Sequence, residues 1–228
     1  QAQGAGGAAD DIDEKHLLAF IVKEKYSNEQ QCKTELKKYC EELKEADGLK
    51  VNDKVKEICD DTKRDGKCKE LKDKVKKELE TFKEELEKAL KDIKDENCEK
   101  YEEKCILLEE TNHDDVKKNC VKLREGCYKL KRKRVAEDLL LRALGKDVKN
   151  GECEKKMKDV CSVLSRESDE LMSFCLDSAK TCGELKTKLD TVCEALKTKL
   201  AKDFEKDCHE RLEKCHFYGE ACTETKCE

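Results

Sequence analysis

Apolar residues spaced three and four apart form the longest regular pattern in the chain, and it begins just after Cys68. Lysine and glutamate fill most positions between them, many of them four residues apart. One apolar face and one charged face at this spacing are typical of an amphipathic helix that packs against its neighbours. The pattern predicts one long helix through Leu71, Val75, Leu79, Phe82, Leu86, Leu90 and Ile93.

A short apolar element precedes each of Cys98, Cys153 and Cys208, and a similar one lies near the start of the chain. This first stretch, from Asp10 to about Lys25, is the most apolar of all, and the aspartates at its front suit a helix N-terminus. Taken alone it resembles a membrane or partner anchor, but its recurrence favours a packed core helix. The recurring positions are Leu17, Leu18, Phe20, Ile21 and Val22; Leu86, Leu90 and Ile93; Leu140, Leu144 and Val148; and Leu196, Leu200 and Phe204.

Turn signals indicate where the helices begin and end. A turn is predicted near residues 111–114, where Thr111 or Asn112 is a candidate cap of the next helix. That helix is expected to run past Cys127 and to end at Gly145. The chain contains no proline, and no segment has the alternation of a strand. Three glycines lie near cysteines: Gly66 near Cys68, Gly126 before Cys127 and Gly183 after Cys182. Each either breaks the helix or admits a close backbone approach.

The cysteines repeat with a nearly constant period. Cys98 and Cys105 form a pair seven residues apart, and Cys120 and Cys127 form a second pair with the same spacing. Such a period marks an array of similar supersecondary units. The later members Cys153, Cys161, Cys175 and Cys182 follow 55, 56, 55 and 55 residues further on, and Cys32, Cys40, Cys59 and Cys68 form a looser first copy.

Helical geometry restricts how these cysteines can pair. Positions seven apart share one helical face but are separated by about 10.5 Å of rise. A disulfide needs Cα atoms about 4.4–6.8 Å apart, so each pair must reach a second helix. If that helix is antiparallel, the bonds nest, which predicts Cys32–Cys68, Cys40–Cys59, Cys98–Cys127, Cys105–Cys120, Cys153–Cys182 and Cys161–Cys175. The pairing of the remaining cysteines stays open: Cys193, Cys208, Cys215, Cys222 and Cys227.

The predicted fold is all-α, with repeated disulfide-stapled antiparallel helical hairpins or bundles joined by long amphipathic helices. The predicted division is a flexible tail at 1–9, a first helical unit with its long connecting helix at 10–97, a second unit at 98–152, a third at 153–207 and a partial fourth at 208–228.

Composition changes this picture mainly by indicating the compartment. Seventeen cysteines in 228 residues are typical of an oxidising, extracellular setting, where covalent links stabilise thin cores. Charged residues make up 46% and aromatic residues 4%, which leaves little apolar surface for a large core. The net charge of −5 gives no reason to expect binding to nucleic acid. No run of 18 apolar residues exists, so direct membrane insertion by this segment is not expected. The small-residue start suggests a processed piece of a larger protein.

Candidate chemistry is sparse. The chain lacks zinc-protease, nucleophile-elbow, phosphate-loop and dinucleotide motifs, so neither an enzyme nor a cofactor or metal protein is predicted. His209 and His216 lie seven apart beside cysteines, which is compatible with a metal site but more typical of exposed polar neighbours. Cys193, the cysteine left over, is a weak candidate nucleophile. The one strong charge cluster is Lys129, Lys131, Arg132, Lys133 and Arg134, interpreted as a solvated helix face, a contact for heparin-like polyanions or a dibasic processing site.

The cysteine pairs in lysine- and glutamate-rich helices resemble those of the major surface glycoproteins of the fungus Pneumocystis. Four blocks carry the resemblance: QCKTELKKYCEELKE, NCEKYEEKCILLEE, NCVKLREGCYKLKRKRVAEDLLLRALG and ECEKKMKDVCSVLS. Together they extend the likeness over about residues 10–228, as the amino-terminal region of such a protein. The chain contains no Asn-x-Ser/Thr sequon.

The resemblance implies an extracellular coat protein of the fungal cell wall, with this chain as a fragment of a larger anchored protein. It further implies adhesion to host cells or matrix glycoproteins, recognition by antibodies and immune evasion through antigenic variation. The alternative from a different class is a disulfide-stapled helical protein that encloses a small ligand such as a lipid. That alternative predicts a continuous apolar lining, which the high charge content does not favour.

Overall fold

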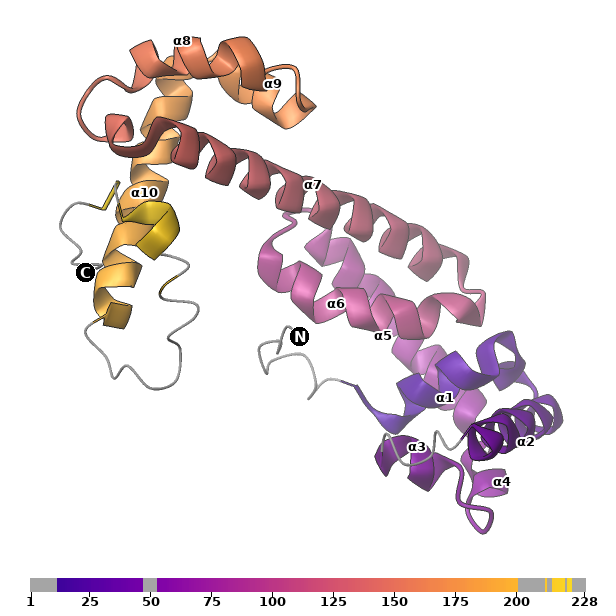
Figure 1. Cartoon of the computed structure of the whole chain (residues 1–228). Helices are drawn as coiled ribbons and strands as arrows, with labels where there is room; N and C mark the ends of the chain where they lie inside the picture. The colour runs from indigo at the N-terminus through magenta and orange to yellow at the C-terminus, as the bar shows by residue number, and fades with distance from the viewer. Residues whose placement is uncertain (1–11, 47–52, 201–211, 213–214, 220, 223–228) are drawn as a thin grey trace. The chain divides into compact units, whose positions relative to one another are not determined.

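The computed structural model describes residues 12–46, 53–200, 212, 215–219, 221 and 222. Within these residues it contains α-helices and short 3₁₀ helices (η) and no strand, which confirms the all-α class (Figure 1). The elements are α1 (Glu14–Val22), η2 (Lys23–Ser27), α2 (Glu29–Glu45), α3 (Asp53–Ile58), α4 (Arg64–Lys67), α5 (Leu71–Ala89), α6 (Asp95–Leu108), η4 (Glu109–Thr111), α7 (Asp114–Leu144), η5 (Gly145–Val148), α8 (Cys153–Leu164), α9 (Asp169–Leu176) and α10 (Ser178–Leu200).

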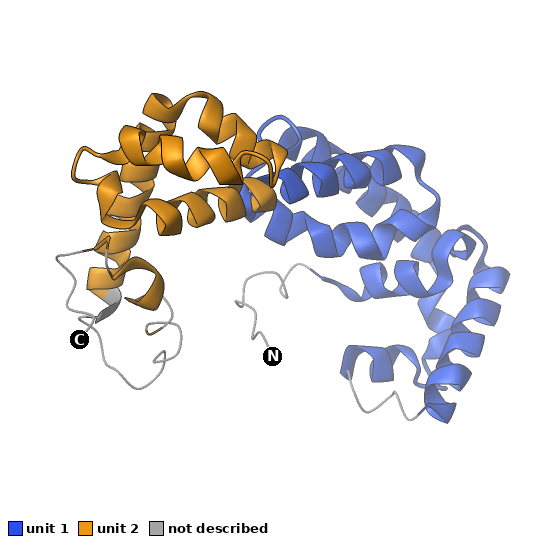
Figure 2. Ribbon diagram, turned by 45° about the horizontal axis from the view of Figure 1, so that its top comes forward, with its two compact units in different colours: residues 1–130 blue, residues 131–228 orange. Residues whose placement is uncertain are grey.

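The chain divides into two compact units, Gln1–Leu130 and Lys131–Glu228, shown in different colours in Figure 2. Helix α7 continues through the boundary between them. This division is coarser than the predicted series of disulfide-stapled units, which stays a prediction. The tail predicted at residues 1–9 lies outside the described residues.

The first apolar segment forms the centre of unit 1. The helix α1 begins after Asp13, whose backbone N–H donates to His16 Nδ1 at 2.9 Å. It packs against α2, α5 and α6, and its residues Leu18, Ile21 and Val22 are buried. The segment is therefore a core helix, as its recurrence indicated. The core of unit 1 also contains buried apolar residues of the other helices, among them Leu36, Ile58, Leu71, Leu79, Phe82, Leu86, Leu108 and Leu123.

The two long helices follow the predicted apolar stripes. Helix α5 ends at Ala89, four residues before the last apolar position of its stripe, Ile93. Helix α7 ends at Leu144, and Gly145 then adopts a φ of +53°, a left-handed conformation that glycine reaches without strain. The sequence therefore predicted this helix end correctly.

The cap of α7 differs from both candidates. His113 Nδ1 accepts a hydrogen bond from the backbone N–H of Val116, at 3.4 Å. Asn112 instead takes a left-handed conformation with φ of 62°, and the Thr111 hydroxyl donates to the Leu108 carbonyl at 2.6 Å. Both proposed caps were therefore wrong: the Thr111 hydroxyl serves the turn before the helix, and the Asn112 amide donates to Glu24 Oε2 of η2 at 2.9 Å.

In unit 2, α8 and the helices α9 and α10 repeat the hairpin that α6 and α7 form, with one interruption. Ser168 caps α9 by accepting from the Leu171 N–H at 3.2 Å. The second arm is then broken at Asp177, with φ −131° and ψ 76°, so that α9 and α10 are separate helices where unit 1 has the uninterrupted α7. The core of unit 2 contains Leu140, Leu141, Leu144, Met157, Leu171, Phe174, Leu185 and Leu189.

The three glycines have different surroundings, although their sequence positions correspond. Gly126 lies inside α7, where a Cβ would overlap the side chain of Ile93. It therefore admits a close approach and does not break the helix. Gly183 lies inside α10 with open space around it, and Gly66 lies in the short helix α4, also without a near neighbour.

Candidate functional site

Disulfides between neighbouring helices are the main covalent feature of both units. The structure places each leading pair of cysteines opposite a second pair on an antiparallel arm, with Cα–Cα distances of 5.4–6.0 Å. All twelve sulfur atoms come from the positions at which the nested scheme expected them. The pairs are Cys32–Cys68, Cys40–Cys59, Cys98–Cys127, Cys105–Cys120, Cys153–Cys182 and Cys161–Cys175.

The cysteines left open by the sequence also form disulfides where the structure describes them. Cys193 of α10 bonds Cys222, with Cα atoms 5.4 Å apart, and the sequence separation of 29 equals that of Cys98–Cys127. Cys215 is disulfide-bonded as well. Cys193 therefore offers no free thiol for nucleophilic chemistry. Cys208 and Cys227 lie outside the described residues.

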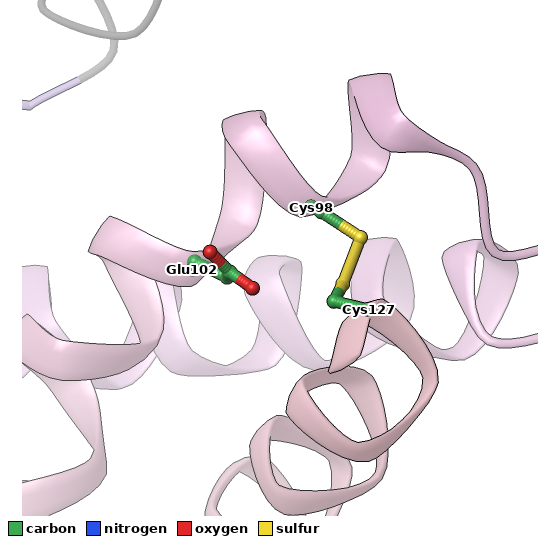
Figure 3. A group of neighbouring side chains, drawn as sticks. All are labelled: Cys98, Glu102 and Cys127. Carbon is green, nitrogen blue, oxygen red and sulfur yellow. A yellow bond between two sulfur atoms is a disulfide. The ribbon is translucent and has the colours of Figure 1, made fainter. Parts of the chain in front are cut away.

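Cys98, Glu102 and Cys127 bring two sulfurs and a carboxylate together in unit 1. Their potential ligand atoms lie within 4.8 Å of one another. Figure 3 shows, however, that the two sulfurs are joined as a disulfide, with the Glu102 carboxylate beside them. Zinc is held by thiolates, which a disulfide does not supply. The group is therefore a half-buried carboxylate next to a cystine.

The basic run lies on α7 and is exposed. Lys129 and all four residues from Lys131 to Arg134 are exposed, as is the next residue, Val135. At about 100° per residue, Lys129, Arg132 and Lys133 share one face, whereas Lys131 and Arg134 point to other sides. Arg132 pairs with Glu170 at 2.7 Å, and Lys133 lies 3.9 Å from Glu137. The cationic side chains of the run therefore point to several sides of α7 and do not form a single flat patch.

The histidines do not form a metal site within the described residues. His209 lies outside them, and His216 is exposed, in edge contact with the ring of Phe217. His113 serves as the cap of α7. His16 is almost fully buried, with its Nδ1 accepting from the Asp13 N–H and its Nε2 2.8 Å from a Glu78 carboxylate oxygen.

A buried ionic cluster centred on Glu78 joins three helices of unit 1. Glu78 of α5 lies 2.8 Å from His16 Nε2 and 2.8 Å from Lys15 Nζ, both on α1, and 3.0 Å from Lys104 Nζ on α6. Lys104 is buried too, and its ammonium lies 5.4 Å from the ring centre of Phe82.

The cluster holds the pKa of the Glu78 carboxyl well below its usual range. The contact with His16 is the largest cause, and the ammonium groups of Lys15 and Lys104 add to it, while burial acts in the opposite direction. The sequence did not reveal this cluster. Lysine and glutamate are so frequent that these four residues stand out only once three helices bring them together.

A pocket of about 200 Å³ lies beside η2, between the end of α1 and η4. Its lining is mainly lysine and glutamate, with Val22 and Asn112 as exceptions. Lys23 at its edge has a φ of 50°, which is unusual for a residue with a side chain. A lipid-binding protein needs a continuous apolar lining, so this pocket does not favour the lipid-binding alternative.

The comparison with protein families identifies part of this architecture. The family model described as major surface glycoprotein matches residues 93–166, which include α6, α7 and α8. Residues 93–166 of the chain are similar to the major surface glycoprotein family. The comparisons with curated proteins and with solved structures gave no match.

The match to the major surface glycoprotein family confirms, over residues 93–166, the resemblance inferred from the cysteine-containing blocks. The matched segment covers the second disulfide-stapled hairpin and the first arm of the third. The family consists of cell-surface glycoproteins and is not a family of enzymes. Among the described residues, no helix combines the length and the apolarity needed to cross a membrane.

Proposed function

We propose that this chain is an extracellular structural and adhesive module of a fungal cell-surface coat, which attaches the cell to host cells or matrix glycoproteins. The family match supports the surface location. The exposed basic segment of α7 supports adhesion, and its natural partners are sulfated, heparin-like polyanions of the host surface.

The basic segment is the observation on which adhesion depends. The protein as a whole carries a net charge of −5, so long-range attraction to a polyanion has to come from a local cluster. Five of the six residues from Lys129 to Arg134 are cationic and exposed. Lys129, Arg132 and Lys133 share one face of the helix, which holds these charges close together at little entropic cost and favours contact with a linear chain of sulfates.

The difference between the buried core and the exposed surface supports a role in immune evasion by antigenic variation. Cystines and leucines form the buried frame, while the exposed faces consist mostly of lysine and glutamate. Exposed substitutions away from special features usually change stability by less than about 0.5 kcal/mol. Antibody-binding surfaces of this chain could therefore change while the stapled helices stay intact.

Heparin binding of the whole chain tests the adhesive role. We expect retention on immobilised heparin at low salt, lost when Lys129, Lys131, Arg132, Lys133 and Arg134 are all replaced by glutamine. The dependence of affinity on salt should also become shallower, because fewer counterions are released on binding. Fibronectin and vitronectin are tested with the same pair of proteins.

A matched control removes five exposed lysines elsewhere, so that both variants carry the same net charge. Unchanged heparin binding in the basic-segment variant, or equal loss in both variants, contradicts this assignment. The control positions are Lys37, Lys38, Lys72, Lys76 and Lys77.

A further inference from the structure

The second and third hairpins share their disulfide pattern but differ in how well their first helices are covered. Cys105 of α6 and Cys161 of α8 hold the same position, since each bonds the nearer cysteine of its second arm. Aligning these two cysteines makes Val163 the counterpart of Leu107. The two helices can therefore be compared position by position.

In unit 1, helix α1 covers the outer face of α6. The two helices pack directly against each other, and the apolar residues of α1 face inward. Cys105 is fully buried, Leu107 is 9% exposed and Leu108 is 1% exposed. Residue Lys104 on the same face is also buried, through its contact with Glu78.

In unit 2, the corresponding face of α8 is open. Val163 is 63% exposed, although its counterpart Leu107 is buried. Cys161 and Leu164 are only partly buried, whereas Cys105 and Leu108 are covered completely. An exposed apolar face on a fold that elsewhere covers the same face with a helix indicates a missing partner helix.

The residues of this open face also indicate what kind of helix fits. Val160 replaces Lys104, so the centre of the face is apolar where unit 1 has a charge. Leu86 and Leu90 of α5 correspond to Leu140 and Leu144 of α7. By that alignment Leu139, which is 41% exposed, replaces Glu85, the residue 3.9 Å from Lys104.

The same alignment reverses one charge at the edge of the face. Arg132 takes the place of Glu78, which in unit 1 binds Lys15 of α1 at 2.8 Å. A lysine at the position of Lys15 would meet the like charge of Arg132, which already pairs with Glu170 at 2.7 Å, so a helix seated on α8 should not carry a lysine there.

We propose that the outer face of α8, formed by Val160, Val163 and Leu164 and flanked by Leu139, binds an amphipathic helix of another protein molecule. This partner helix presents leucine, isoleucine and valine on one face, as α1 does in unit 1. The α1 of the same chain is not available, because it is buried in unit 1 and tied to α2 by the short helix η2. The proposal does not depend on the adhesive role of the basic segment.

Binding of a fluorescent peptide with the sequence of residues 12–27 to the whole chain tests the proposal by anisotropy. We expect saturable one-to-one binding that is at least tenfold weaker in Val163→Asp. A peptide with Lys15→Glu should bind two- to fivefold more tightly than the unchanged peptide, because the substitution removes the repulsion between the lysine and Arg132. Circular dichroism verifies that the protein variant keeps its helices, as expected at an exposed position.

The matched control is Leu176→Asp on α9. Leu176 is 82% exposed, more than Val163, but its counterpart Val121 is exposed in unit 1 as well, so it lies outside the face that α1 covers. Equal weakening by both substitutions indicates non-specific apolar binding and overturns the proposal, as does the absence of saturable binding. If Val163→Asp leaves peptide binding unchanged, the peptide binds elsewhere on the protein, and the proposal is likewise overturned. If the chain associates with itself and Val163→Asp abolishes that association, the face binds a second copy of the chain instead.

Discussion

Replacing Glu78 by glutamine removes the one negative charge at the centre of the buried cluster. The change leaves His16 and Lys104 nearly buried, at 1% and 10% side-chain exposure, without the Glu78 carboxylate, and Lys104 keeps only the more distant Glu85 at 3.9 Å. Removing one partner of a buried ion pair typically costs about 3–5 kcal/mol. Lys15 is partly exposed and the glutamine oxygen still accepts a hydrogen bond, so we expect a smaller loss of about 2–3 kcal/mol at pH 7.

The pH dependence of this loss has a definite sign. Because the folded protein holds the pKa of Glu78 below its ordinary value of about 4.3, the carboxylate contributes its full stabilisation above that value. The contribution then disappears as the pH falls further, since the unfolded chain takes up the proton first. At pH 3 the difference between the two proteins should shrink by about 1.8 kcal/mol, from about 1.4 kcal/mol per pH unit below 4.3.

Urea unfolding with intact disulfides, followed by circular dichroism at pH 7 and pH 3, measures both quantities. Glu80→Gln is the matched control, since Glu80 lies on the same helix with its side chain 71% exposed and should change stability by less than about 0.5 kcal/mol. A Glu78→Gln protein as stable as the Glu80→Gln protein at pH 7 would refute the reasoning. A difference that stays constant between pH 7 and pH 3 would also contradict it.

Two further predictions concern packing and covalent links. Gly126→Ala should lower the free energy of unfolding by about 1 kcal/mol, because the added methyl overlaps the side chain of Ile93. In an Ile93→Ala background the overlap is gone, and the same substitution should raise the free energy of unfolding by up to about 1 kcal/mol, because alanine favours the helix. Gly183→Ala, with open space around it, should be stabilising, and an effect of Gly126→Ala that is the same in both backgrounds contradicts the overlap. Removing the Cys105–Cys120 bond with two serines should cost about 3 kcal/mol for its 15-residue separation. Peptide mapping without reduction checks the pairing, and a bond between two cysteines of one helix, or a reduced protein with an unchanged melting temperature, would refute it.

Much of the fold follows from local patterns. The stripe from Leu71 to Leu86 gives a helix because its 3.6-residue period is a local property of the chain. The end of α7 at Gly145 follows in the same way from the freedom of one glycine. The structure also joins the cysteines in the nested order, since two thiols two turns apart on one rod can reach only a neighbouring rod.

The candidate sites could be predicted less well from the sequence than the helices. The basic segment was visible as a charge cluster, but its distribution around the helix matters only once its exposure is known. The bond between Cys193 and Cys222 joins α10 to the C-terminal segment, and its separation of 29 residues, the same as that of Cys98–Cys127, was a signal in the sequence that the pairing scheme did not use. The His113 cap was missed because histidine is an uncommon cap and stronger candidates stood beside it.

The sequence by itself determined the helices, their apolar faces and the spacing that makes covalent links between helices possible, because each depends on residues close together along the chain. The tertiary structure alone decided which charges are buried together around Glu78, which glycine admits a neighbour and which hairpin keeps an uncovered face. These features depend on contacts between distant segments. In a chain with 46% charged residues, many such contacts look equally plausible until the helices are packed.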